Sequence, residues 1–312
     1  MTEPSALVGV LYSGEPSLPR VLHGLESQNG IVLRTIVVGH HPFAEAHQRL
    51  YRAFDERRDE HDLFVKVDAD MEIVEPRLLA SLGSLFRVSP ALDLVLLGVD
   101  DWLSGERIMG MHAWRRGMRW RGAPSPLFAD IPQTDVRNRV KFMDLPRPLV
   151  LHATEPSAAQ SRRYGAQRGL KVVDTLKRSR LDRMQTFVRF VAANPEPERL
   201  LAVAGVETAL IDRELADRCL FGDTRLTSEE IERFESLATD PDLCTRTLER
   251  LENLRERTTI DGSGTDRTLG GTTAGRRHGA FHRRSQKLVR RIRRRPSIDS
   301  TALFEDFRQL LG

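Results

Sequence analysis

A largely apolar run that ends in two carboxylates constrains this chain more than any other feature. Residues 62–71 read DLFVKVDADM, which is typical of a strand packed on both faces of a sheet. Open α/β sheets bind ligands outside the carboxyl ends of their strands, so Asp68 and Asp70 are expected at such a site. Because strand side chains alternate, both are predicted to share one face and to hold a divalent cation and, through it, a diphosphate. Alternatively, one of them caps a helix that begins near Glu75.

The first hundred residues predict an α/β fold with a mostly parallel central sheet, flanking helices and a helical C-terminal region. The apolar pattern places strands at 6–12, 31–38, 63–67 and 92–99, and helices at 18–28, 43–59 and 76–87. Periodicity weakens over 100–148, where we expect irregular or mixed structure over the sheet edge, and 149–152 form a last short strand. Helices are expected at 158–169, 181–193, 198–214, 227–237 and 243–256, with a capping box at Thr227 and Glu230.

This pattern divides the chain into an α/β domain at 1–155, a helical extension at 156–258, a flexible linker at 259–275 and a basic tail with a short terminal helix at 276–312. Residues 276–295 hold ten Lys or Arg and no acid, so the rest of a chain with net charge +4 has a net charge of −6. The tail can lie on an anionic membrane surface, stay solvated or bind nucleic acid. With 6% aromatic residues, the body gives no basis for a nucleic-acid partner.

Composition predicts a cytoplasmic globular protein, peripheral at the inner membrane face if the tail binds lipid. The chain is 40% hydrophobic and 29% charged, and its start has neither a basic region nor an apolar stretch long enough for export. Cys219 and Cys244 lack the paired spacing of a zinc site and fit a reducing compartment.

Four further residues are candidates for binding at the same sheet edge. His152 ends a strand, and an imidazole together with carboxylates suits a divalent metal such as Mn²⁺, although a strand-end histidine can also be purely structural. His47 follows the second strand and can contact a phosphate or ribose, or be a solvated polar residue. Tyr12 can stack on a base or fill the core, and Ser13 can reach a sugar or phosphate.

Asp130 is the candidate general base that deprotonates an acceptor hydroxyl, with Asp100, Asp101 and Asp135 as competitors. The arginine-rich run at 115–121 can bind an acidic or phosphorylated acceptor or form a solvated face. Trp114 and Trp120 can pack on sugar faces or belong to the core.

Together, the strand at 6–12, the Glu45-Ala46-His47 helix, the D-x-D element and His152 resemble nucleotide-sugar glycosyltransferases of the GT-A fold, most closely family-2-like bacterial enzymes of surface-polysaccharide assembly. The resemblance covers about residues 5–175. It implies that Asp68 and Asp70 contact ribose and a Mn²⁺ or Mg²⁺ ion, that His152 completes the metal shell, and that Asp130 activates the acceptor. It also implies a UDP- or GDP-sugar donor and a glycan or lipid-linked acceptor.

Two other classes stay open. Nucleotidyltransferases also bind metal and triphosphate at strand ends, but they normally have a Gly-rich basic loop after the first strand, where this chain has Ser13-Gly14-Glu15. A non-catalytic carbohydrate-binding or scaffold protein on a transferase fold is the third class.

Overall fold

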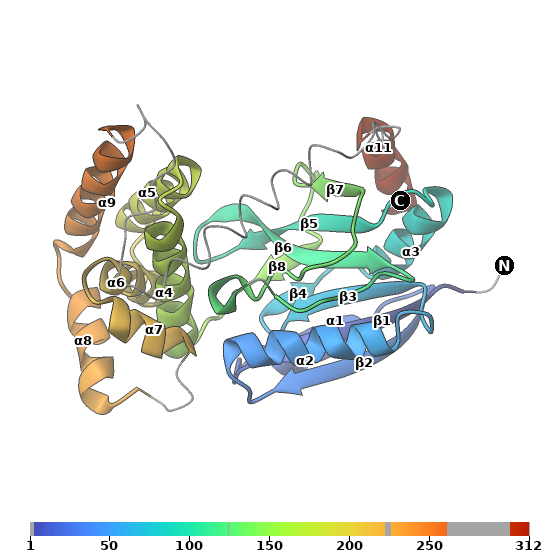
Figure 1. The fold of residues 1–312 in the computed structure, drawn as a ribbon, viewed down its shortest axis with the longest axis horizontal. Helices are drawn as coiled ribbons and strands as arrows, with labels where there is room; N and C mark the ends of the chain where they lie inside the picture. Colours follow the sequence, from blue (N-terminus) through green and yellow to red (C-terminus); the bar gives the residue numbers. More distant parts are fainter. Residues whose placement is uncertain (1–2, 124, 222–225, 261–299, 312) are drawn as a thin grey trace.

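The computed structural model describes residues 3–123, 125–221, 226–260 and 300–311. An α/β unit and a helical unit lie side by side (Figure 1). Residues 259 and 260 of the linker predicted at 259–275 end a helix, and the rest of that linker and the basic segment at 276–295 lie outside the described residues. In the described part of the chain, no helix is long and apolar enough to cross a membrane.

One sheet organises the α/β unit. Within the described residues it has eight strands in the order β2-β1-β3-β6-β5-β8-β4, with β7 paired to β5. β1 pairs in parallel with β2 and β3, and β5 in parallel with β7 and β8, whereas β6 is antiparallel to both β3 and β5, and β4 is antiparallel to β8. The strands are β1 (Ser5–Tyr12), β2 (Val32–Gly39), β3 (Leu63–Asp68), β4 (Met71–Ile73), β5 (Leu94–Asp101), β6 (Glu106–Arg115), β7 (Arg139–Phe142) and β8 (Val150–His152).

The α/β class is confirmed, and the sheet is mixed because β6 and β4, neither of which was predicted from the sequence, run antiparallel to their neighbours. β6 falls in the region expected to be irregular, yet it lies in the middle of the sheet between β3 and β5. Its glycine and its methionine, tryptophan and arginine side chains obscure the strand pattern, and the pairing with β5 shifts register between Leu97 and Gly98. The prediction of structure over the sheet edge was therefore wrong for 106–115.

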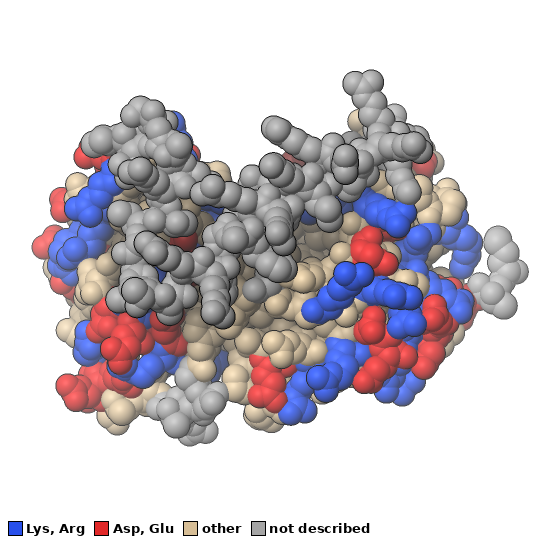
Figure 2. Space-filling view, in the orientation of Figure 1, with Lys and Arg blue, Asp and Glu red and all other residues tan. Residues whose placement is uncertain are grey.

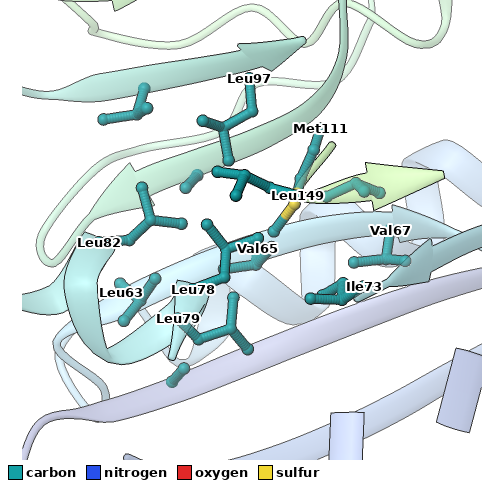
Figure 3. Packing of buried hydrophobic residues seen from close by; sticks show 14 of the residues in the cluster. Leu63, Val65, Val67, Ile73, Leu78, Leu79, Leu82, Leu97, Met111 and Leu149 are labelled. Carbon is teal, nitrogen blue, oxygen red and sulfur yellow. The ribbon is translucent and has the colours of Figure 1, made fainter. Parts of the chain in front are cut away.

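Helices cover both faces of the sheet. α1 (Leu18–Glu26) and α3 (Leu78–Val88) pack on one face, and α2 (Phe43–Glu56) packs on the other. Figure 3 shows Leu78, Leu79 and Leu82 of α3 near Leu63 and Val65 of β3. These alternate positions of β3 face α3, so the intervening Lys66 and Asp68 point toward the α2 face.

The helical unit has its own apolar core, formed by α4 (Ala158–Thr175), α5 (Arg178–Ala193), α6 (Pro197–Ile211), α7 (Arg213–Phe221), α8 (Ser228–Ala238) and α9 (Leu243–Ile260). α7 was not predicted as a separate helix. The capping box is confirmed, because Thr227 accepts from the Glu230 N–H and Glu230 accepts from the Thr227 N–H. Gly165 lets α4 approach α6 closely, since a Cβ there would overlap the carbonyl oxygen of Ala202.

The terminal helix α11 (Ser300–Leu311) packs on the α/β unit beside α3 (Figure 1). Leu303 and Phe307 belong to the core of that unit, and the Phe307 ring stacks on Phe142 with centroids 4.8 Å apart. α11 therefore completes the apolar core of the α/β unit, to which β1 also contributes.

Candidate functional site

A cleft of about 2130 Å³ lies between the carboxyl-end side of the sheet and the helical unit. All seven residues predicted for the site line this cleft: Tyr12, Ser13, His47, Asp68, Asp70, Asp130 and His152. They come from β1, α2, β3, the β3–β4 turn, the 129–138 loop and β8. The topology thus brings together residues up to 140 positions apart along the chain.

The two D-x-D carboxylates have different backbone settings. Asp68 is the last residue of β3, whereas Asp70 lies in the turn before β4 and accepts at its carbonyl from the Ala153 N–H. The prediction that one strand face holds both was therefore wrong in its geometry, although both side chains reach the cleft. Neither carboxylate caps α3, whose N-cap residue Arg77 makes no side-chain cap hydrogen bond.

Lys66 is the ion-pair partner of Asp68. Its ammonium nitrogen lies 2.9 Å from Asp68 Oδ1, and the lysine side chain is buried. The two residues are two apart on one strand, which places them on the same face. Although burial opposes it, the charge of Lys66 lowers the pKa of the Asp68 carboxyl. Asp68 is therefore ionised at neutral pH.

A buried carboxylate holds His152 in position. Nδ1 of His152 lies 2.8 Å from Asp101 Oδ1, and Nε2 faces Asp70 Oδ1 at 3.5 Å. Asp101 also accepts from the hydroxyls of Ser104 and Tyr164. These bonds fix the imidazole ring with one nitrogen turned toward the D-x-D turn.

The pKa values of Asp70 and His152 are both raised, but for different reasons. Burial raises the pKa of Asp70 to about 6, assisted by Asp68 and opposed by His152. Burial lowers the pKa of His152, but Asp70 and Asp101 outweigh it and raise the value to about 9. In this state His152 carries a proton between two carboxylates, and a cation at the same place would replace that proton.

The floor of the cleft contains polar side chains that burial keeps neutral. His47 donates from Nδ1 to the Phe43 carbonyl at 2.8 Å, and burial together with Lys66 lowers its pKa to about 4. His112 has a pKa lowered to about 4 for the same reasons. Among the described residues, His47 Nε2, His112 Nδ1 and Tyr51 Oη have no hydrogen-bond partner. The interpretation of His47 as a solvated residue was wrong, because only 3% of it is exposed.

Asp130 is the only one of the candidate bases that lines the cleft. Its Oδ2 lies 2.9 Å from the Lys171 ammonium, which lowers the pKa of Asp130 against the effect of burial. Asp100 pairs with Arg107, Asp101 supports His152, and Asp135 accepts from the Arg119 N–H outside the cleft.

The other candidates differ in their contacts and in their burial. Tyr12 packs edge-on against His40, with centroids 5.2 Å apart, and Ser13 donates its hydroxyl and N–H to Glu15. Trp114 and Trp120 are buried in an aromatic cluster, as their interpretation as core residues predicts, and Trp114 also borders the cleft. No arginine of the 115–121 run lines the cleft.

A divalent metal fits part of this donor set. Carboxylate oxygen and imidazole nitrogen are ligands for Mn²⁺ and, for the oxygens, Mg²⁺. Asp70 Oδ1 is buried without a hydrogen-bond partner among the described residues and faces His152 Nε2. In the described part of the chain, however, no group of three or more His, Cys, Asp or Glu side chains is arranged to hold a metal. Asp70 and His152 therefore supply two ligands at most in this arrangement.

Lys66, Asp101, Tyr164 and Lys171 are site residues that the sequence did not identify in these roles. Lys66 lies in the strand that ends in the D-x-D motif, and its position two residues before Asp68 indicates that the two side chains share a face. Tyr164 and Lys171 lie on α4, one helical face of which borders the cleft, but nothing in the sequence indicated which face that would be.

No protein-family model matches the sequence, and no curated protein matches it. Among solved structures, the chain is similar to S. aureus TarS, with 10% identity and a TM-score of 0.32 over 81% of this chain and 55% of TarS. It is also similar to the mannosyltransferase PcManGT from Pyrobaculum calidifontis in complex with GDP-Man and Mn²⁺, with 11% identity and a TM-score of 0.36 over 100% of this chain and 86% of PcManGT. The chain thus spans about half the length of TarS. Similarity of this extent assigns no activity, donor or metal to this chain.

Proposed function

We propose that this protein is a metal-dependent glycosyltransferase that moves a sugar from a nucleotide-sugar donor to a hydroxyl group of an acceptor. The observation that supports this most is the convergence of Asp68, Asp70 and His152 at one cleft, with His152 oriented by the buried Asp101. A carboxylate behind a histidine fixes its tautomer and leaves the other nitrogen for a cation.

In this proposal Asp70 and His152 bind a Mn²⁺ or Mg²⁺ ion, and Asp68 contacts the ion or the donor ribose. When bound, the ion neutralises the charge that develops on the diphosphate leaving group. Tyr12 and Ser13, at the end of β1, and His47, on α2, bind the nucleoside and phosphate part of the donor. Gln160 on α4 supports Asp70, since its amide nitrogen lies 3.4 Å from Asp70 Oδ2.

Asp130 is the proposed general base of an inverting transfer. Its carboxylate is ionised and oriented by Lys171 at 2.9 Å, and its other oxygen, Oδ1, has no hydrogen-bond partner among the described residues. That oxygen can accept the proton of an acceptor hydroxyl while the hydroxyl oxygen attacks the sugar carbon.

The resemblance of the motifs extends the proposal to a GT-A-type, family-2-like hexosyltransferase that takes a UDP- or GDP-sugar. Its acceptor would be a glycan or a lipid-linked glycan of cell-surface polysaccharide or glycolipid assembly, at the cytoplasmic side of the membrane.

Release of nucleotide from a panel of UDP-, GDP-, TDP- and CMP-sugars tests the proposal, with Mn²⁺ and with a chelator. We expect metal-dependent release from one donor that falls by about 100-fold or more in Asp70→Asn and in Asp130→Asn. Asp59→Asn and Asp135→Asn are matched controls outside the cleft and should retain the wild-type rate. An unchanged rate in Asp70→Asn would exclude the metal role, and no release from any donor would exclude the enzyme.

A further inference from the structure

The charge of the cleft is opposite to that of the rest of the protein. The residues that line it include twelve Lys or Arg and six Asp or Glu, a net charge of +6. The whole chain has net charge +4, of which 276–295 contribute +10 and the cleft lining +6, so the other residues sum to −12. On the outer face near α2 and β2, basic and acidic side chains are interspersed (Figure 2). Outside segment 276–295, the excess of cations is therefore a property of the cleft.

Ion pairs inside the protein account for five of these twelve cations. Five form ion pairs with acidic side chains: Lys66, Arg107, Arg168, Lys171 and Arg218. Seven have no acidic partner within 4.0 Å among the described residues. One of these, Arg163, donates to the Ser13 carbonyl at 3.5 Å. The other six lie in two groups, and of them Arg183 donates from Nε to the Ser179 carbonyl at 3.1 Å.

The first group, the strand wall, consists of Arg137, Arg139 and Lys141 at β7. Their side chains are exposed, and they alternate with the buried Val140 and Phe142, which places Arg139 and Lys141 on one face of the strand. β6 and β5 separate β7 from β3 in the sheet. Three strand spacings amount to about 14 Å, so these cations are too far from the D-x-D turn to contact a diphosphate held there.

The second group, the helical wall, consists of Arg162 of α4 and Arg180 and Arg183 of α5. Arg162 is only 7% exposed, yet it has no acidic partner among the described residues. Because Arg162 lines the cleft, an anion bound there would supply the counter-charge that the described residues do not provide. Burial and the neighbouring charge of Arg183 lower the pKa of Arg180, which an anion bound between them would reverse.

We propose that the acceptor is a polyanionic chain, bearing phosphate or carboxylate groups, that binds across the cleft between the strand wall and the helical wall. The role of the polyanion as an acceptor rests on the proposed function, but its binding can be measured without any donor. Two walls of three cations each match several anionic groups along one chain better than a single anion. Complementary charge of this kind also accelerates association.

The test is titration of the full-length protein with inorganic polyphosphate and with polygalacturonate, at several salt concentrations, with neutral dextran for comparison. The strand-wall variant is R137Q/R139Q/K141Q and the helical-wall variant is R180Q/R183Q. The matched control is R116Q/R119Q/R121Q, which removes three exposed arginines outside the cleft. Arg162→Gln and the conservative Arg162→Lys are made separately, and circular dichroism checks the fold of each variant.

We expect each wall variant to weaken polyanion binding by about ten-fold or more and the control variant by less than about two-fold. Added salt should weaken polyanion binding most in the wild type, because it has the most cations in the cleft. Arg162→Lys should bind more tightly than Arg162→Gln. The ratio of the affinities for polyphosphate and polygalacturonate identifies the preferred group. Equal losses in the walls and in the control would overturn the proposal.

Two further experiments distinguish this site from binding by the basic tail and from binding to a membrane surface. If replacing the ten cations of 276–295 by Gln abolishes binding while the wall variants retain it, the tail is the site and the proposal fails. If the walls bind phosphatidylglycerol vesicles and polyphosphate does not compete, the ligand is a membrane surface and the proposal also fails. Wall-dependent polyanion binding in a protein that releases no nucleotide from any donor would refute the glycosyltransferase but not the polyanion site.

Discussion

Acidification should destabilise this protein through two histidines at the floor of the cleft. His47 and His112 have pKa values lowered from 6.5 to about 4, first by burial and then by Lys66. A histidine with a depressed pKa contributes stability above its unfolded pKa, and this contribution is lost as the pH falls from about 6.5 toward about 4, because the unfolded chain binds the proton first.

The size of the effect follows from the difference of 2.5 between 6.5 and about 4. At about 1.4 kcal/mol per pKa unit, complete titration costs about 3.4 kcal/mol for each histidine. At about pH 4.5 most of that is already lost, which is about 2.5 kcal/mol each and about 5 kcal/mol for both. This is a large part of the stability of an ordinary domain.

Urea unfolding of the wild type, H47Q, H112Q and the double variant between about pH 7 and pH 4.5 measures this. We expect each substitution to remove about half of the histidine-dependent pH slope. His152, with its pKa raised to about 9, stabilises below about pH 6.5 and loses this effect at higher pH, but it is present in all four proteins and cancels in the comparison. The exposed His23→Gln is the control. A slope in the double variant equal to that of the wild type would show that His47 and His112 do not carry the pH dependence of stability.

Three other substitutions test the packing and the site. Asp101→Asn should leave His152 with a neutral partner and weaken Mn²⁺ affinity by about 10- to 100-fold in calorimetry without donor; unchanged affinity would show that Asp101 does not position the histidine. Gly165→Ala should lower the free energy of unfolding by about 3 kcal/mol, because its Cβ overlaps the Ala202 carbonyl, and a melting temperature equal to that of the wild type would contradict the close α4–α6 contact. Phe307→Ala should cost about 3–5 kcal/mol in urea unfolding, whereas the exposed Gln309→Ala should cost less than about 0.5 kcal/mol; similar values for the two would show that α11 does not complete the core.

The site could be predicted from the sequence where the signal was local. Asp68 and Asp70 follow an apolar strand, and Tyr12 and His152 also end strands. Because strand ends at one edge of a sheet converge, these residues could be expected at one site, and the structure places all of them in the cleft lining. The roles of these residues as metal, donor and catalytic groups stay predictions that the proposed assays test.

The strand β6 and the arginine-rich run at 115–121 could not be placed correctly from the sequence. β6 holds a glycine and mixed side chains, and it becomes a central strand only because β3 and β5 are available on both sides. Conversely, the arginine-rich run at 115–121 was a conspicuous motif in the sequence, but the structure turns it away from the cleft.

The alternation of strands and helices, the capping box at Thr227 and the acidic ends of the strands could be read from the sequence, since each depends on residues within one turn or one strand. The tertiary structure alone decided that Asp101 supports His152 from 51 residues away, that Lys171 holds Asp130 from 41 residues away, and that six cations of β7, its preceding loop, α4 and α5 face one cleft. Such contacts depend on how separate elements pack, and packing is a property of the whole chain that no local pattern encodes.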